Sequence, residues 1–212
     1  YFAGLGPRGR FALSELRIYL ETRDSHTTDI TAFEEMLSPE LSNALLTLIV
    51  DPNNWAAVDW ADKLRKEAEG NGIECMVFSC RPYEQSRIMD GAVIWPAKQI
   101  SGPELAVVVA HLAGGWKREQ FRPIDEDIFR SFQNEFCLFS TGEATGQNYL
   151  LKAAMNAMDS LSECMEPGQA LRMMAHFICP GDIDLEDLEQ AENKIRLRLN
   201  PDAYLVPSCC LD

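Results

Sequence analysis

The sequence lacks long hydrophobic runs and is poor in basic residues. No apolar run reaches the roughly 18 residues that a membrane-spanning helix needs, and the N-terminus has no signal-peptide pattern. Lys and Arg number 19 against 33 Asp and Glu, so the formal net charge is -14. Nucleic-acid binding relies on clustered basic residues, and the same negative charge is repelled by anionic membranes. We therefore expect no nucleic-acid partner and no direct membrane insertion.

Metal-ligand patterns are also missing. The three histidines are far apart in sequence and no C-x-x-C pair occurs, so a structural zinc site is not expected. The cysteines number seven, an odd number, and most lie within apolar runs. This pattern is typical of reduced, buried thiols in a cytoplasmic protein rather than of a disulfide framework.

What is present is an alternation of strand-like and helix-like segments. The chain has 212 residues, of which 46% are hydrophobic, enough to bury a sizeable core. Strands alternating with helices predict a parallel, doubly wound sheet whose ligands bind beyond the C-terminal ends of the strands. The expected elements are strands at 44–50, 73–79 and 92–95 and a helix at 55–69.

A glycine-rich segment opens the chain. Phe2-Ala3 reads as the end of a strand, Gly4, Gly6 and Gly9 as a G-x-G-x-x-G loop, and the next residues as a helix. Such a loop lets a backbone approach a pyrophosphate at a helix N-terminus, but many α/β proteins use it only for a tight turn. Both interpretations stay open here. The helix after the loop is expected to bury Ala12, Leu13, Leu16 and Leu20.

The second half of the chain predicts a buried helix and then a smaller α/β region. Residues 103–116 are apolar almost all round, so His111 is best interpreted as a packed or hydrogen-bonded core histidine. Asp125, Glu126 and Asp127 open a further helix as N-terminal carboxylates.

A strand at 136–139, a turn at 142–146 and an amphipathic helix follow. That helix is expected to bury Leu150, Leu151, Ala154, Met158 and Leu161.

Further on, residues 175–188 read as a strand, a glycine turn and an acidic helix start. The carboxylates at 182–189 are interpreted as capping and solvating that helix, since they lack EF-hand spacing for calcium. Its other face is expected to bury Leu185, Leu188, Ala191, Ile195 and Leu199.

This order of parts resembles the bacterial cell-division tubulin homologue FtsZ. Residues 144–158, ATGQNYLLKAAMNAM, are similar to the family pattern A-S-G-x-N-R-A-x-x-A-A-x-x-A-I, and residues 175–188 resemble its following strand, glycine turn and helix start. The segment 4–13 resembles the family's first phosphate loop, G-V-G-G-x-G-x-N-A-V. The resemblance implies a nucleotide-binding domain, a central helix and a small C-terminal α/β domain.

The sequence departs from that family where the nucleotide would bind. Pro7 removes an amide donor from the first loop and Phe11 stands where the family has Asn. After Val50, where the signature G-G-G-T-G-T-G belongs, the chain has Asp51-Pro52-Asn53-Asn54-Trp55. A carboxylate, a proline and an indole remove the attraction and room that glycines give a triphosphate.

The catalytic carboxylates are only partly kept. In the family, an acidic loop of one subunit orients the attacking water at the nucleotide of the next subunit. At the matching positions the chain keeps Asp125 but has Pro123 for the family's Asn and Ile128 for its second Asp. The resemblance implies a catalytic role for Asp125, while the residues themselves favour a helix cap.

We therefore expect an α/β, shortened and degenerate FtsZ/tubulin-like protein. The expected domains are a reduced Rossmann-like GTPase domain at 1–102, a central helix and acidic-loop helix at 103–134, and a C-terminal domain at 135–212. The resemblance implies a cytoplasmic, homo-oligomeric protein whose partner is itself or an FtsZ/tubulin-like protein, with GTP turnover lost or very weak. No cofactor is expected in this reading.

Two alternatives stay open. One is an active, polymerising GTPase that binds GTP with Mg²⁺ through Gly4, Gly6 and Gly9. The other is a dinucleotide-dependent oxidoreductase, which needs an acidic residue about 20 residues beyond the glycine loop; Asp24 and Asp29 lie in that region but follow no visible strand.

Overall fold

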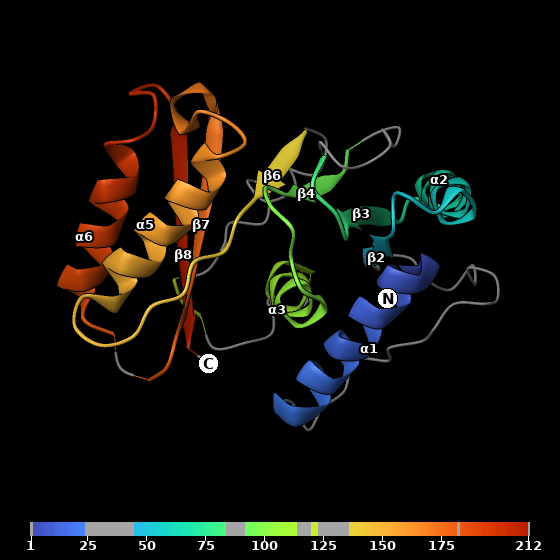
Figure 1. Ribbon diagram of the computed structural model, residues 1–212, viewed down its shortest axis with the longest axis horizontal. Coiled ribbons are helices and arrows are strands. Elements are labelled where there is room, and N and C mark those ends of the chain that lie inside the picture. The colour runs from blue at the N-terminus through green and yellow to red at the C-terminus, as the bar shows by residue number, and fades with distance from the viewer. Residues whose placement is uncertain are drawn as a thin grey trace. The chain divides into compact units, whose positions relative to one another are not determined.

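The computed structural model describes residues 2–23, 45–83, 92–113, 120–122, 136–181 and 183–211. The chain divides into two compact units, each containing a sheet (Figure 1). Unit 1 comprises residues 1–115 and 132–137, and unit 2 comprises residues 116–131 and 138–212. Among the described helices, none has the length and apolar character needed to cross a membrane.

The five-stranded sheet has the strand order β1-β2-β3-β4-β6, and β1 to β4, all within unit 1, pair in parallel. Residues 46–50 of β2 are all buried, although alternate side chains of a strand point to opposite faces. Both faces of this sheet must therefore be covered, as is typical of parallel sheets. The strands are β1 (Phe2–Leu5), β2 (Leu45–Val50), β3 (Glu74–Ser79), β4 (Ile94–Pro96) and β6 (Cys137–Phe139).

Three helices cover this sheet. In Figure 1, α1 (Gly6–Arg23) and α3 (Gly102–Ala113) lie side by side on one face, and α2 (Trp55–Gly70) lies on the other. Helix α1 buries Ala12, Leu13, Leu16 and Leu20, which confirms the face expected from its spacing. Helix α3 begins with a reciprocal cap, in which the Ser101 amide donates to Glu104 and the Glu104 amide donates to the Ser101 hydroxyl.

The predicted elements of unit 1 agree with the observed ones to within two residues at each end, except around the glycines. The prediction of a loop from Gly4 to Gly9 is wrong, because Gly4 lies within β1 and Gly9 lies in the first turn of α1. The end of the helix predicted at 103–116 lies outside the described residues.

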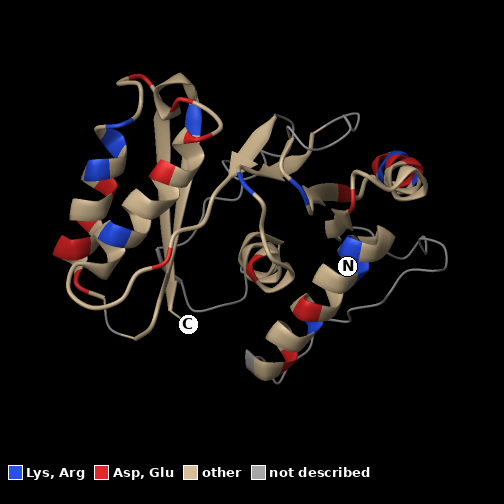
Figure 2. Cartoon of the chain, in the orientation of Figure 1, with Lys and Arg blue, Asp and Glu red and all other residues tan. Residues whose placement is uncertain are grey.

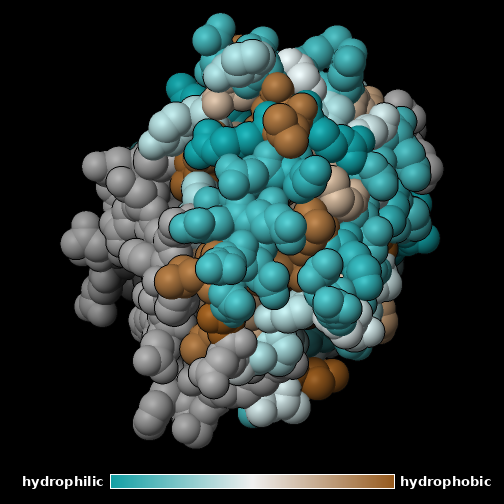
Figure 3. All heavy atoms as spheres, turned by 90° about the vertical axis from the view of Figure 1, so that its left-hand side faces the viewer, coloured by the Kyte–Doolittle hydropathy of each residue, from teal (hydrophilic) through white to brown (hydrophobic). Residues whose placement is uncertain are grey.

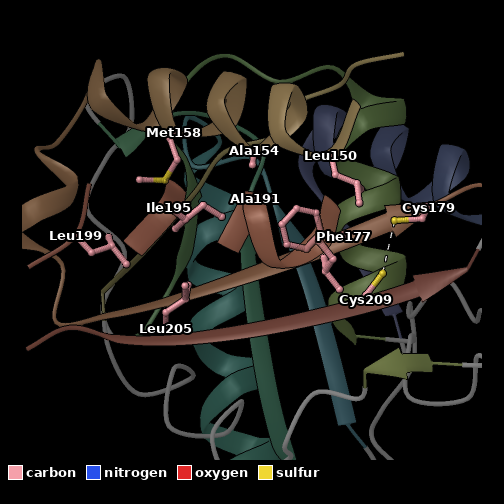
Figure 4. Close-up of a cluster of buried hydrophobic side chains, with 11 residues drawn as sticks. Leu150, Ala154, Met158, Phe177, Cys179, Ala191, Ile195, Leu199, Leu205 and Cys209 are labelled. Atoms are coloured by element: carbon pink, nitrogen blue, oxygen red, sulfur yellow. Dashed lines mark hydrogen bonds between the residues drawn. The ribbon is translucent and has the colours of Figure 1, made fainter. Parts of the chain in front are cut away.

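Unit 2 is built on a three-stranded sheet of order β5-β8-β7. Strands β7 (Arg172–Cys179) and β8 (Tyr204–Leu211) pair in parallel, and β5 (Gln120–Arg122) pairs antiparallel to β8. Helices α5 (Tyr149–Ser162) and α6 (Leu185–Arg196) pack together over one face of the β7–β8 pair (Figures 1 and 4). A single turn of 3₁₀ helix, η3 (Pro167–Gln169), follows α5.

The core of unit 2 lies between these helices and strands. It is formed by Leu150, Ala154, Met158, Phe177, Cys179, Leu188, Ala191, Ile195, Leu199, Leu205 and Cys209 (Figure 4). The predicted stripe of α5 is confirmed except at Leu151, which is only partly buried. The predicted buried face of α6 is wrong at Leu185, which is 52% exposed. Leu185 directly follows the N-cap Asp184 and therefore lies before the first packed turn of the helix.

The turn before α5 crosses that helix closely. A side chain at Gly142 would overlap the backbone of Ala153 and Ala157 on α5, and Ser140 donates to the Ala157 carbonyl at 2.8 Å. Gly146 and Asn148 then adopt left-handed backbone angles, with φ of 79° and 58°. The missing side chain at Gly142 thus permits close backbone packing, and Gly146 permits the tight turn before α5.

The described charges lie mainly on the helices, where acidic and basic residues are interspersed along α2 and α6 (Figure 2). The side of the molecule that carries α5 and α6 is mostly hydrophilic, with separate hydrophobic side chains among the polar ones (Figure 3). This pattern is that of a solvated surface.

Candidate functional site

The candidate site lies where β1, β2 and β3 end, at the edge where ligands bind in parallel α/β sheets. Leu5 pairs with Val50, and Val50 pairs with Ser79, so the residues after these strands are neighbours. The Asp51 amide donates to the Leu5 carbonyl at 3.0 Å, and the Cys80 amide donates to the Val50 carbonyl at 2.9 Å. These bonds bring together the start of α1 and the starts of the loops after β2 and β3.

The three glycines of the first motif have distinct structural roles. Gly6 has φ of 76°, a left-handed conformation that glycine adopts readily and that lets α1 start directly after β1. Gly4 and Gly9 lie against each other, and a side chain on Gly9 would overlap the Ile49 carbonyl in β2. Both glycines therefore permit the close approach of α1 to the strands.

The space next to Gly6 is occupied by the loop after β2. An added Cβ on Gly6 would lie 3.0 Å from the Asp51 Cβ, 3.3 Å from the Asn54 Cβ and 3.2 Å from the Ala57 Cβ. These side chains cover the turn from which a pyrophosphate would be bound in a nucleotide-binding fold. The protein itself therefore fills the position next to the glycine turn.

The same loop uses its own backbone donors internally. The Asn53 amide donates to the Asp51 carboxylate at 3.3 Å, and the Asn54 amide donates to the Asp51 carbonyl at 3.0 Å. The Asn54 side chain caps α2 by accepting from the Ala57 amide at 3.1 Å. Pro52 has no amide proton. These groups therefore do not form the open amide nest that binds phosphate.

An ion pair fixes the carboxylate of this loop. Asp51 is 5% exposed, and its carboxylate accepts from the Arg81 Nε at 3.0 Å. Ser79 holds the loop of Arg81 by accepting from the Arg81 amide at 3.1 Å and donating to the Arg81 carbonyl at 2.7 Å. A phosphate at this edge would meet a buried negative charge whose arginine partner is already engaged, so the donor set does not fit a triphosphate.

Burial and nearby charges also affect the neighbouring thiol of Cys80. Burial, followed by the charge of Asp51, raises the pKa of Cys80 to about 12, although Arg8 and Arg81 act in the opposite direction. A thiol with so high a pKa is protonated at neutral pH and is a poor nucleophile. The described residues at this edge are therefore closely packed and paired in charge.

The other predicted residues fall in several places. Asp125 lies outside the described residues, and its catalytic role stays a prediction, as does nucleotide binding by Gly4, Gly6 and Gly9. Trp55 is 65% exposed, so most of its indole lies in solvent and does not fill this edge as expected. His111 is confirmed as a core residue, since it is 3% exposed and its Nε2 lies 2.9 Å from the Tyr19 hydroxyl.

Sequence reasoning missed the role of Arg81. Asp51 follows β2 directly, and Arg81 follows β3 after one further residue, so the parallel pairing of these strands brings their side chains together. Opposite charges just beyond neighbouring parallel strands were the available signal for this ion pair.

The parallel sheet with helices on both faces, followed by a smaller α/β unit, defines an FtsZ/tubulin-like fold, and the expected fold class is confirmed. Two solved structures of FtsZ from M. jannaschii are similar to this chain. One, an empty FtsZ dimer, has a TM-score of 0.61 at 13% sequence identity, covering 80% of this chain and 59% of the FtsZ chain.

The other, a W319Y mutant of that FtsZ, has a TM-score of 0.57 at 13% identity and covers 95% of this chain and 64% of its own. The chain thus spans less than two thirds of the length of either FtsZ. No protein-family description matches the sequence, and no curated protein matches it.

Proposed function

We propose that this chain is a pseudo-GTPase of the FtsZ/tubulin type that acts through association with itself or with a filament-forming partner. The fold supports a protein of the FtsZ/tubulin type, and the packing of residues at the ends of β1 and β2 argues against nucleotide turnover. The observation that carries the proposal is the packing of Asp51 and Asn54 against Gly6.

The electrostatic argument supports the loss of nucleotide binding. A GTP placed at this edge would have to displace Asp51 from Arg81 and bring triphosphate oxygens next to a buried carboxylate. Breaking such a buried pair leaves an uncompensated charge, which typically costs several kcal/mol. The glycine amides that would offset this cost in the family are replaced by Pro52 and by amides that already have acceptors.

The similar FtsZ described as a dimer supports association as the remaining role. Self-assembly in a protein that does not turn over nucleotide would depend on protein concentration and not on GTP. A filament-forming relative of this chain is the other partner that the fold favours.

The decisive experiment measures GTP binding by calorimetry in the presence of Mg²⁺, GTP turnover, and self-association by sedimentation velocity with and without GTP. We expect no binding, no turnover above background, and concentration-dependent association that GTP leaves unchanged. A robust GTPase rate that disappears in Asp125→Ala would overturn the proposal and favour the active, polymerising GTPase.

A matched pair of variants tests the carboxylate block directly. Asp51→Asn keeps the shape of the side chain but removes its charge and releases Arg81, so GTP or inorganic phosphate should bind more tightly than to the parent protein. Asp59→Asn, on the exposed side of α2, removes one negative charge elsewhere and should leave binding unchanged. Equal effects of the two substitutions would show that only net charge matters.

Calorimetry with NAD(H) and NADP(H) in place of GTP distinguishes the dinucleotide-dependent oxidoreductase from these two hypotheses, because only the oxidoreductase should bind them. Its support is the glycine motif alone, and the acidic residues at 24 and 29 that it requires lie outside the described part of the chain.

A further inference from the structure

Two cysteines meet inside the core of unit 2. Cys179 ends β7 and Cys209 lies in β8, their sulfur atoms are 3.6 Å apart, and both residues are fully buried (Figure 4). Their positions are diagonal, because Cys209 pairs with Phe177 and Cys179 pairs with Leu211. Cys210, the next residue along, points to the opposite face of the strand.

Tyr149 supports one of these thiols. It is the first residue of α5, and it packs against the buried cluster that contains Cys179. Hydrogen bonds from Cys209 and then from Tyr149 lower the pKa of the Cys179 thiol, while burial acts in the opposite direction. A lowered pKa favours the thiolate of Cys179, the form that reacts with electrophiles.

The start of α5, at Tyr149, packs next to Cys179 and lacks a side-chain cap. The N-cap Asn148 is left-handed and makes no side-chain cap bond, and residues 145–148 are exposed. Helix ends without such caps open more readily than helix interiors. A small oxidant would reach Cys179 by the opening of this turn.

We propose that Cys179 and Cys209 form an oxidation site that hydrogen peroxide or another small hydroperoxide converts to a disulfide. Cys179 is the attacking thiolate, Cys209 the resolving thiol and Tyr149 a positioning residue that donates to the attacking sulfur.

The two steps balance. The Cys179 thiolate attacks one peroxide oxygen, the O–O bond breaks, and the other oxygen leaves as hydroxide and takes a proton to become water, which leaves Cys179 as a sulfenic acid. The Cys209 sulfur then attacks the Cys179 sulfur, the S–S bond forms, the S–O bond breaks, and a second water carries away the Cys209 proton. Two thiols lose two electrons to one peroxide.

The diagonal placement gives this disulfide a distinctive property. Cys179 and Cys209 are displaced from each other by two residues along neighbouring parallel strands. Closing the separation of their sulfur atoms from 3.6 Å to about 2.05 Å therefore requires these strands to approach or slide. A disulfide formed under such strain is reduced more readily than a relaxed one. The oxidised form should therefore be reversed by glutathione.

The test treats the reduced, folded chain with hydrogen peroxide and maps the products by mass spectrometry without reduction. We expect a loss of two hydrogens and a cross-linked peptide joining β7 to β8, reversed by glutathione. Cys75 and Cys80 serve as internal references, because burial raises the pKa of each thiol to about 12 and they should react last.

Variants assign the roles. Cys209→Ala should stop at a sulfenic acid on Cys179 that dimedone captures, and Cys179→Ala should abolish oxidation of the pair. Cys210→Ala, beside Cys209 but on the opposite face, should leave the cross-link unchanged. Tyr149→Phe should slow oxidation roughly three- to tenfold near neutral pH, the effect expected from losing one hydrogen bond to a charged sulfur, and should shift the pH profile of the rate upward.

The proposal is overturned by any of three results. These are oxidation of all seven cysteines at one rate, a cross-link that excludes Cys179 or Cys209, or a folded protein that resists peroxide at levels that oxidise the unfolded chain. Circular dichroism of each variant identifies those that fail to fold. The Tyr149→Phe rate then decides the outcome, because it requires no change at either cysteine.

Discussion

Single glycines decide how closely the backbone segments of this protein approach. Gly9 faces the Ile49 carbonyl, Gly4 faces Gly9, and Gly142 faces the backbone of α5. None of these three positions needs a left-handed φ, so it is the absence of a side chain that matters there. A glycine motif associated with nucleotide binding can therefore be required by packing alone.

Gly9→Ala separates these two roles. Its added methyl would overlap a carbonyl in the buried strand β2, so we expect a loss of about 2–4 kcal/mol of unfolding free energy, measured by chemical denaturation without nucleotide. Gly70→Ala is the matched control, because a methyl there meets nothing within 4 Å and should be neutral or slightly stabilising. A Gly9→Ala protein as stable as its parent would contradict the packing role.

Helix caps are the features that position the elements of unit 1. Asn54 caps α2, and Ser101 and Glu104 cap each other at the start of α3. Hydrogen bonds from the Ser101 hydroxyl and amide lower the pKa of Glu104. A depressed carboxyl pKa contributes stability above the pKa of the unfolded chain, and this contribution is lost as pH falls through the folded value.

Glu104→Ala should therefore destabilise the protein by about 0.5–1 kcal/mol at neutral pH, a small amount because the carboxylate is largely exposed to solvent. The difference from the parent should shrink as the pH is lowered through the acid range in which Glu104 takes up its proton. Thermal melts across pH 3 to 7 measure it, with Glu67→Ala as an exposed control. A difference independent of pH would point to helix propensity rather than to the cap.

The elements themselves were largely predictable from sequence, for reasons that differ between residues. Leu150, Ala154 and Met158 recur at helical spacing, so the packed face of α5 follows from periodicity. Leu185 shares that spacing in α6 but lies before the first packed turn, which periodicity does not encode.

The candidate site was only half predictable. The chemistry of Asp51 and Pro52 was visible in the sequence, but the pairing of Asp51 with Arg81 depends on strands β2 and β3 being neighbours in register. The contact between Cys179 and Cys209 likewise depends on register, because the two residues are 30 positions apart in the chain.

At the scale of the whole molecule, the net charge opposes the association of two copies. The chain carries a formal net charge of -14, so two copies repel each other at low ionic strength. Salt screens this repulsion, with a Debye length of about 10 Å at 0.1 M and about 3 Å at 1 M.

Self-association should therefore strengthen as potassium chloride is raised from low to moderate concentration, measured by sedimentation velocity at fixed protein concentration. Sucrose at matched viscosity is the control, since it adds no ions. Association that weakens steadily with salt would instead indicate an interface held by ion pairs between complementary charged patches.

The closed loop after β2 also sets a limit on how a nucleotide site could be introduced into this protein. Asp51, Pro52 and Asn54 act together, through an ion pair, a missing amide and a helix cap, so a single substitution such as Asp51→Asn relieves the repulsion of phosphate but does not create an open nest of donors. A stepwise change by point mutation would pass through variants that have lost the helix cap and not yet gained a ligand. An engineer who wants a GTP-gated version would have to transplant the whole segment, and a lineage that acquired this loop would find the change difficult to reverse.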